Sequence, residues 1–302
     1  MREIGYRPAL LLSSAFISNN NELLPYKLKP SSTSDYSGVL ATIDSDGYRV
    51  VAPHVESERK VLLLGDSVVF GYGLNDDETI PSQLQRLTKD QVVNIGVPGY
   101  SSWNEYAALK DYLEIHNVSK VILLYIPNDI TFDNNHGGIG NGQFNDTSNS
   151  SFHRFLRFMY AHFYISYLIS DRIKAITNRD KTQKVVVDWP ALDYSMQATR
   201  RIKELCQQNG IDFQVGIYRD IWYYSDKEAA EDYERRVSTA LESIGVRCFV
   251  IKSHIDNLKL SEARVAWNDP HPSATAAKLI AEEINLVSMM RVSPPQVSTA
   301  SK

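Results

Sequence analysis

From Lys60 onward, short apolar runs alternate with longer segments of helical pattern, and this alternation constrains the fold more than any other feature of the sequence. The apolar runs are rich in Val, Ile and Leu and lack polar alternation; they comprise residues 61–64, 92–95, 121–126, 213–217 and 246–251. Such runs are typical of strands that are covered on both faces. Helix-like periodicity fills the intervals at residues 102–116, 191–208, 226–243 and 273–287. The alternation therefore predicts an α/β fold, in which helices cover both sides of a central parallel sheet.

The segments outside this alternation set the expected domain boundaries. Residues 1–58 are expected to form an irregular N-terminal arm, because a polar run is followed there by a stretch rich in Pro, Ser, Thr and Tyr at 25–37. The main domain is expected to span residues 59–288, with an insertion at 131–184. Residues 289–302 are expected to form a disordered tail.

The insertion has two parts of different composition. Residues 131–151 hold four glycines among Asn and Ser, which is typical of a mobile loop. Residues 152–177 carry seven aromatic side chains together with basic residues. A helix that packs its aromatic side chains on the sheet is the simpler interpretation, and a lid or a membrane-touching helix is the alternative.

Charge and cysteine content exclude several classes of protein. Lys and Arg total 32 against 36 for Asp and Glu, a formal net charge of −4. This balance provides no large attraction to a phosphate backbone, so no nucleic-acid partner is expected. Cys206 and Cys248 are too few for a disulfide-built scaffold and lack metal-ligand spacing, so no metal site is expected. The sequence has neither Gly-x-Gly-x-x-Gly nor Gly-Lys-Ser/Thr, and no cofactor is expected.

The apolar segments are too short to predict a membrane span, since no window has enough uncharged apolar residues for a transmembrane helix. A cytoplasmic location is favoured, and export through a signal peptide within residues 1–18 is the alternative. The apolar stretch at 9–18 follows Arg2 and Arg7, but it is short and lacks a clean Ala-x-Ala cleavage site. The oligomeric state is left open.

The apolar run that begins at residue 61 leads into Gly65-Asp66-Ser67, which is the sharpest local feature of the sequence. Ligands bind at the carboxyl ends of parallel strands, because loops and helix N-termini converge there. Ser67 is therefore a candidate nucleophile, and the alternative role for a serine at such a position is a helix cap. The Gly-x-Ser-x-Gly elbow is absent, which argues against the α/β-hydrolase fold.

A serine nucleophile needs a base, and His271 is the strongest candidate among the seven histidines. It lies between Pro270 and Pro272, which stiffen the backbone, and Asp269 is two residues before it. A carboxylate this close can set the tautomer of the imidazole and stabilise its cation. The alternative is a helix-entry turn that Asp269 caps.

Two further strand ends offer donors for an oxyanion. The run at 92–95 leads to Gly99, whose backbone N–H has no side chain beside it to obstruct a ligand. The run at 121–126 leads to Asn128, whose side-chain amide is a second donor. Each segment alone would indicate only a turn, but all four candidate segments either follow a predicted strand or precede the last helix.

Taken together, these segments resemble the sequence blocks of the SGNH hydrolases, also called the GDSL esterase/lipase family. Gly65-Asp66-Ser67 is similar to the nucleophile block, and Gly99 lies in a segment similar to the glycine block. Asn128-Asp129 and Asp269-Pro-His271-Pro resemble the asparagine and histidine blocks. The resemblance covers roughly residues 60–287. A segment of the arm, residues 44–49, is similar to one that precedes the nucleophile strand in bacterial members linked to surface polysaccharides.

The resemblance implies a flavodoxin-like three-layer α/β/α sandwich that hydrolyses esters or thioesters without a metal. Ser67 would attack the acyl carbonyl, and His271 would act first as base and then as acid. The N–H groups of Ser67 and Gly99 and the side-chain amide of Asn128 would hold the oxyanion.

Two positions depart from the pattern of that family. Ile126 stands two residues before Asn128, where the family usually has glycine. Asn268 stands three residues before His271, where the family's acid commonly lies. Asp269 is therefore the preferred orienting acid, and Asn268 is the alternative.

Aromatic residues next to these blocks indicate the substrate class. Tyr100, Trp103, Trp222 and Trp267 are candidate substrate-binding residues, because aromatic faces with polar edges suit sugar rings and acyl chains. Core packing is the alternative role for each. A small-molecule or saccharide ester is the expected substrate, most of all an O-acetylated saccharide. The alternative functions are an O-acyltransferase of polysaccharide assembly and a non-catalytic carbohydrate-binding module that keeps the fold.

Overall fold

The computed structural model describes residues 16–36, 39–132, 187–221, 226–266 and 269–289. The predicted insertion and tail lie almost wholly outside these ranges, as do Trp222, Trp267, Asn268 and most of the candidate signal peptide.

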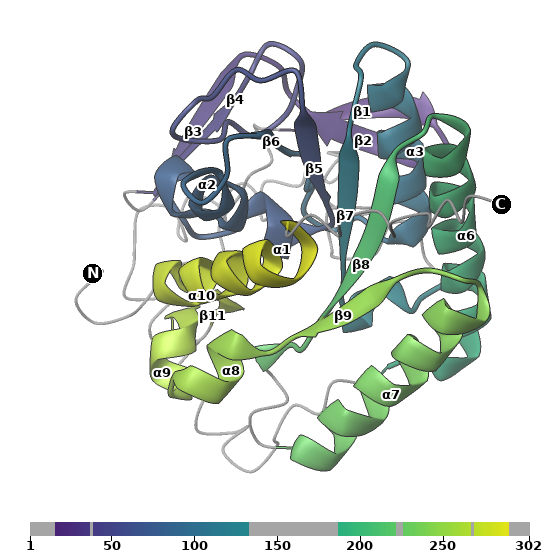
Figure 1. The fold of residues 1–302 in the computed structure, drawn as a ribbon. Helices are drawn as coiled ribbons and strands as arrows, with labels where there is room; N and C mark the ends of the chain where they lie inside the picture. Colours follow the sequence, from purple (N-terminus) through teal and green to yellow (C-terminus); the bar gives the residue numbers. More distant parts are fainter. Residues whose placement is uncertain (1–15, 37–38, 133–186, 222–225, 267–268, 290–302) are drawn as a thin grey trace, which may run out of the picture.

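A five-stranded parallel sheet forms the centre of the fold, in the order β6-β5-β7-β8-β9 (Figure 1). Its strands are β5 (Lys60–Leu64), β6 (Gln91–Asn94), β7 (Lys120–Tyr125), β8 (Asp212–Tyr218) and β9 (Cys248–Ile251). The chain passes from β5 to β6 on one side, and then crosses to β7 on the other side of β5. Ligands bind where the strand order reverses in this way, outside the carboxyl ends of the strands. The loops after β5 and β7 are therefore neighbours at the place where a site is expected.

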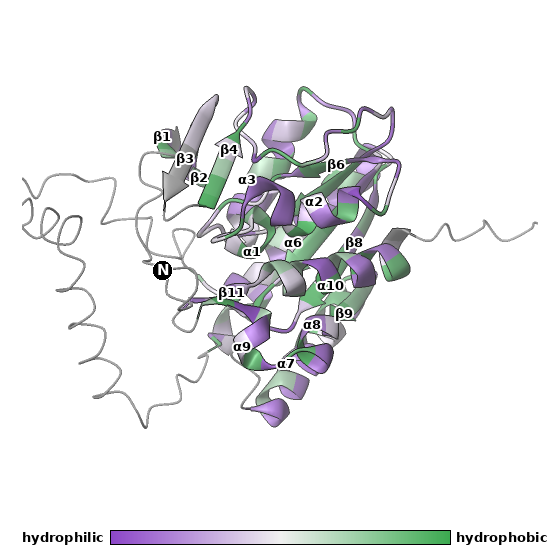
Figure 2. Cartoon of the chain, turned by 90° about the vertical axis from the view of Figure 1, so that its left-hand side faces the viewer, coloured by the Kyte–Doolittle hydropathy of each residue, from purple (hydrophilic) through white to green (hydrophobic). Residues whose placement is uncertain are grey.

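Helices cover both faces of this sheet. One face is covered by α3 (Ser102–Leu113), α6 (Leu192–Gln208) and α7 (Lys227–Ser243), and the other by α2 (Ile80–Gln85) and α10 (Ala274–Ile284). Every residue of β7 is buried, as expected for a strand covered on both faces. Figure 2 shows apolar residues gathered in the sheet and polar residues on the outer surfaces of the helices. The predicted α/β fold is confirmed, with three layers and a central parallel sheet.

The shorter elements of this domain include α1 (Ser67–Phe70), α8 (Ser253–Asn257), α9 (Leu260–Ala263), β10 (Arg264–Ala266), β11 (Asp269–Pro272) and a π-helical turn at Asn285–Met289. No helix within the described ranges is long and apolar enough to cross a membrane.

The prediction of an irregular N-terminal arm is wrong for much of residues 16–43. These residues form two antiparallel hairpins: β1 (Phe16–Asn21) with β2 (Leu24–Leu28), and β3 (Ser32–Tyr36) with β4 (Val39–Ile43). Alternate residues of β2 and β4 are buried, and all of them except Val39 join a hydrophobic cluster that includes Phe70 and Tyr100. The polar/apolar alternation spans only five residues in each of these strands and is surrounded by Ser, Asn and Pro, so the strand signal was missed.

Arg49 connects this N-terminal segment to the main sheet. Its backbone forms bridges with Ile43 and Asn94, and the residue is only 2% exposed. The guanidinium donates hydrogen bonds to the carboxylate of Asp76 (3.2 Å) and to the carbonyl oxygens of Phe70 (2.8 Å), Gly71 (2.7 Å), Leu40 (3.1 Å) and Leu74 (2.6 Å). All three guanidinium nitrogens thus bond to acceptors, and most of these lie at the end of α1 or in the loop after it.

We expect Arg49→Met to lower the free energy of unfolding by about 3–5 kcal/mol, because it leaves a carboxylate and several buried carbonyl oxygens without their donor. Urea denaturation measures this change. The control is Arg59→Met, since the Arg59 side chain is 53% exposed and its ion pair with Asp90 spans 3.3 Å. The control should cost less than about 1 kcal/mol. Equal losses in the two variants would contradict a bracing role for Arg49.

Candidate active site

The turn between β5 and α1 presents Ser67 at the start of a short helix. The carboxylate of Asp66 caps this helix, because its Oδ1 accepts the N–H of Val68 at 2.8 Å. Gly65 allows the helix to pack closely on the strand end: a Cβ at this position would lie 2.5 Å from Cγ2 of Val69. The local sequence therefore places the Ser67 hydroxyl at the carboxyl edge of the sheet.

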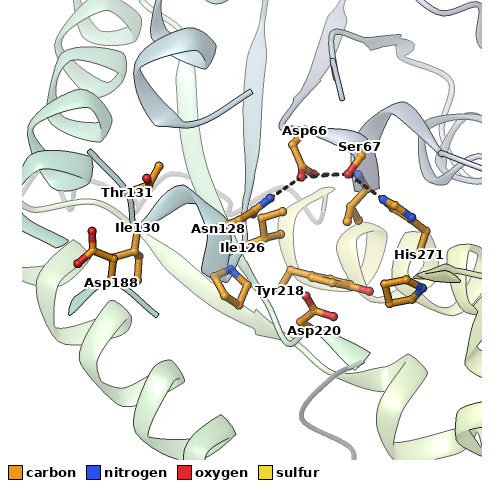
Figure 3. Close-up of a pocket in the computed structure, with 13 residues that line it drawn as sticks. Asp66, Ser67, Ile126, Asn128, Ile130, Thr131, Asp188, Tyr218, Asp220 and His271 are labelled. Carbon is orange, nitrogen blue, oxygen red and sulfur yellow. Dashed lines mark hydrogen bonds between the residues drawn. The ribbon is translucent and has the colours of Figure 1, made fainter. Parts of the chain in front are cut away.

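Three side chains form a continuous hydrogen-bonded chain at this edge, and Figure 3 shows the link between Ser67 and His271. Oγ of Ser67 lies 2.9 Å from Nε2 of His271, and Nδ1 of His271 lies 2.6 Å from Oδ1 of Asp269. The same Asp269 oxygen also accepts the backbone N–H of His271 at 3.1 Å. Asp269 and His271 lie on β11, which pairs with β10. Ser67 and His271 are 204 positions apart in the chain, and the fold brings them into contact. Between the two candidate acids, Asp269 contacts the imidazole, whereas Asn268 lies outside the described residues.

His271 is held between an acidic partner and an aromatic ring. The ring of Tyr72 lies 4.7 Å from the imidazole, centroid to centroid, at an interplanar angle of 33°. Burial alone would lower the pKa of His271, but the hydrogen bond and charge of Asp269, together with the charges of Asp66 and Asp220, raise this pKa above its usual value. The site therefore favours the protonated imidazole more strongly than water does.

Asp66 joins the serine to Asn128. Its Oδ2 lies 3.1 Å from Oγ of Ser67 and accepts a hydrogen bond from Nδ2 of Asn128, also at 3.1 Å. Asn128 lies in the 3₁₀ turn Pro127–Asp129 that follows β7, and Oδ2 of Asp129 closes this turn by accepting the Ile126 N–H at 2.8 Å. Hydrogen bonds of Asp66 therefore link the loop after β5 to the turn after β7.

A cavity of about 450 Å³ adjoins these groups. Its lining includes Ser67, Asn128 and His271, together with Tyr218, Asp220 and Asp188 (Figure 3). Within the described ranges, no group of three or more His, Cys, Asp or Glu side chains is arranged to hold a metal ion. The chemical groups that the cavity offers are a hydroxyl, an imidazole, an amide and several carboxylates.

Two other candidates from the sequence do not line this cavity. Gly99 is buried with a φ of 83°, in the turn after β6, and its role as an oxyanion donor stays a prediction. Tyr100 is corrected from a substrate-binding residue to a core residue. It is 2% exposed, its hydroxyl donates to the carbonyl of Tyr26 at 2.6 Å, and the two rings lie 5.3 Å apart.

Trp103 also lies outside the lining of the cavity. Its ring packs against Tyr106 and Tyr194, with centroids 6.0 and 5.7 Å away, and its Nε1 is buried. Trp222 and Trp267 lie outside the described residues. Of the four candidate substrate-binding residues, the two that the structure describes, Tyr100 and Trp103, therefore do not line the cavity.

Sequence reasoning missed the roles of Asp66, Tyr72 and Asp220. Asp66 had a local signal, because a carboxylate directly before a serine at a strand end can cap the next helix and contact the serine. Tyr72 lies about 200 positions before His271 in the chain, and Asp220 lies about 50 positions before it. The tertiary fold brings both residues to the site. No local pattern marks such contacts.

No protein-family model and no curated protein matches this sequence. Among solved structures, a lipolytic G-D-S-L family member from Veillonella parvula is similar at 12% identity and a TM-score of 0.45, over 77% of this chain and 100% of that one. A psychrotrophic esterase from Pseudoalteromonas sp. has 14% identity and a TM-score of 0.42, over 75% and 94%. An acetyl xylan esterase has 10% identity and a TM-score of 0.44, over 74% and 97%.

Proposed function

We propose that this protein is a serine-dependent carboxylic ester hydrolase. One observation carries the proposal: the chain from Ser67 through His271 to Asp269, with contacts of 2.9 and 2.6 Å, at the edge of a cavity. A nucleophile within hydrogen-bond reach of a base, which a third group orients, is the geometry that acyl transfer requires.

In the first half of the reaction, Ser67 takes the acyl group. Oγ of Ser67 attacks the carbonyl carbon while Nε2 of His271 accepts the hydroxyl proton. Asp269 accepts the Nδ1–H of His271, which keeps Nε2 available as the base and stabilises the imidazolium. His271 then donates the proton to the leaving alcohol as the carbon–oxygen bond of the ester breaks.

In the second half, water replaces the alcohol. His271 takes a proton from the water, which attacks the acyl-enzyme, and returns a proton to Oγ of Ser67 as the carboxylic acid leaves. The acidic surroundings of His271, which raise its pKa, stabilise the imidazolium that forms in both halves.

The developing oxyanion needs donors near Ser67. The N–H of Ser67 lies at the start of α1, where backbone N–H groups have no acceptor within the helix. Nδ2 of Asn128 carries two hydrogens; one points to Asp66, which leaves the other for the substrate oxygen. Gly99 is the third donor that the family resemblance implies.

An O-acetylated saccharide is the substrate class that we propose. Asp188, Asp220 and Tyr218 add hydrogen-bonding groups to the lining of the cavity, next to apolar Ile126 and Ile130. Such a mixture suits sugar hydroxyls and a small acyl group, and the volume of about 450 Å³ lies in the range of small-molecule sites.

A fluorophosphonate probe tests the proposed nucleophile directly. We expect the probe to label wild-type protein at Ser67, identified by peptide mass, and not to label Ser67→Ala. A folded wild-type protein that resists the probe would contradict the proposal and favour a non-catalytic binding module.

A set of p-nitrophenyl esters and an acetylated oligosaccharide test the substrate class. We expect p-nitrophenyl acetate to have a higher kcat/KM than the octanoate, and we expect acetate release from the saccharide. A preference for the octanoate would contradict the small-acyl assignment. Faster transfer of acetyl groups to sugar than to water would instead identify an O-acyltransferase.

A further inference from the structure

Glu105 and Asp129 are two buried carboxyl groups beside the candidate active site that the proposed reaction does not use. Glu105 lies on the first turn of α3 and is 0% exposed, and Asp129 ends the turn that carries Asn128 and is 1% exposed. Neither oxygen of Glu105 accepts a hydrogen bond from a described residue, and neither does Oδ1 of Asp129. Buried polar atoms almost always have a partner, because an unsatisfied one costs free energy. These three buried acceptor atoms without a donor belong to two side chains whose charges act on each other, and they require an explanation.

The charges around this pair are all acidic. Burial and the charges of Asp129 and Asp66 raise the pKa of Glu105 well above its usual range, and burial and the charge of Asp66 raise the pKa of Asp129. The charges of Asp129 and Glu105 also act on Tyr125, on β7: burial first and then these charges raise the pKa of its hydroxyl well above the usual value, and this hydroxyl lies 2.7 Å from Oγ of Ser195. No described cation balances the two carboxyl groups.

Asp66 differs from the pair because the fold supplies it with donors. It accepts the N–H of Val68 and the amide of Asn128, and the Ser67 hydroxyl lies within hydrogen-bond distance. These contacts stabilise an ionised carboxylate. The negative charge at Asp66 makes a second and a third ionised carboxyl group nearby unfavourable.

We propose that Glu105 and Asp129 share one proton, and that the pair is a positioning device for Asn128. A shared proton supplies the missing donor for two neighbouring carboxyl groups, because the O–H of the protonated group donates to a free oxygen of the other group. Oδ1 of Asp129 is such a free acceptor, while Oδ2 holds the Ile126 N–H and closes the turn. The shared proton thus links α3 to the turn that presents the Asn128 amide to the substrate.

Loss of this proton would place three negative charges in a buried region. The turn at Ile126–Asp129 would then shift to separate them, and Asn128 would move away from the oxyanion. Because an oxyanion donor acts mainly in the transition state, the loss should lower kcat rather than raise KM. The kinetic consequence rests on the proposed ester hydrolysis, but the presence of the proton does not.

Infrared spectroscopy detects the proton without any enzymatic activity. At neutral pH, the difference spectrum between wild type and Glu105→Gln should contain the C=O stretch of a protonated carboxylic acid. Asp129→Asn should shift the frequency of the same band, because the proton on Glu105 then faces an amide in place of a carboxylate. The control is Glu114→Gln, at the exposed end of the same helix, which should remove only a carboxylate band. Only carboxylate bands in the Glu105→Gln and Asp129→Asn spectra would overturn the proposal.

Kinetics test the positioning role. Glu105→Gln keeps a neutral hydrogen-bond donor and should retain kcat within a few-fold. Because this variant has no shared proton to lose, its kcat should not fall at alkaline pH through ionisation of the pair. Glu105→Ala should lower kcat about 10²-fold with little change in KM, as expected for a misplaced oxyanion donor. Equal kcat in wild type and Glu105→Ala would overturn the positioning role, and so would a folded Glu105→Gln as impaired as the alanine variant.

The two experiments also separate the proton from the proposed function. If Glu105→Ala does not fold, the infrared comparison and the Glu105→Gln kinetics still decide the proposal. If wild-type protein hydrolyses no ester, the proposed function fails, whereas the infrared spectra still report whether the pair holds a proton.

Discussion

Ser67→Ala is expected to lower kcat for p-nitrophenyl acetate by about 10⁵-fold. Removal of the nucleophile in a hydrogen-bonded serine–histidine–aspartate chain eliminates the acyl-enzyme route, and only the oxyanion donors and substrate binding remain. The change removes one hydroxyl at a helix start, so the fold should persist. Steady-state kinetics and thermal unfolding measure the two effects separately.

The matched control is Ser243→Ala. This serine ends α7, and its exposed hydroxyl donates a hydrogen bond to the carbonyl of Ala240. The control should keep wild-type kcat. If Ser67→Ala retains turnover within about tenfold of wild type, another group attacks the ester and the nucleophile assignment is wrong.

Asp269→Asn is expected to lower kcat by roughly 10³- to 10⁴-fold. The amide lacks the charge that stabilises imidazolium, and its NH₂ group can turn toward Nδ1 and favour the wrong tautomer of His271. The 2.6 Å contact that Asp269 now makes with Nδ1 is the basis of this expectation. Side-chain size is almost unchanged, so KM should change little.

The same variant should change the pH dependence in a defined direction. His271 acts as base only when neutral, so activity is lost as the pH falls through its pKa. Asp269 raises this pKa above the usual 6.5, so the acid limb of wild-type kcat/KM should have its midpoint above that value. In Asp269→Asn the midpoint should move to lower pH. Profiles between about pH 5 and pH 8 measure it, and an unchanged midpoint would contradict the assigned role. The control is Asp193→Asn, in the first turn of α6.

Much of the fold followed from local sequence patterns. The five sheet strands and the helices α3, α6, α7 and α10 begin and end within about three residues of the predicted ranges. The apolar runs and the helical periodicity indicate directly which residues are buried. The N-terminal hairpins were missed for the opposite reason. Their alternation is short, and their strands become favourable only when residues such as Leu24 and Tyr26 can pack against Phe70 and Tyr100.

Some features of the candidate site could likewise be predicted from the sequence, and others arise only in the tertiary structure. Ser67, His271, Asp269 and Asn128 could be named from the sequence, because each lies in a compact motif next to a strand or helix end. Tyr100 was assigned to the substrate because an aromatic side chain beside the glycine turn suits a sugar ring or an acyl chain; the β1–β2 hairpin, which the sequence did not predict, buries it. The tertiary fold alone creates the bridge from Asp66 to Asn128, the packing of Tyr72 against His271, and the Glu105–Asp129 pair.

The order of strands and helices and the identity of the reactive side chains were thus encoded locally, since hydrophobic periodicity and strand-end motifs depend on neighbours in the chain. The distances between those side chains, their burial and the direction of their pKa shifts were decided by tertiary structure alone. These properties arise from contacts between segments far apart in the sequence, and such contacts exist only after the sheet has brought the segments together.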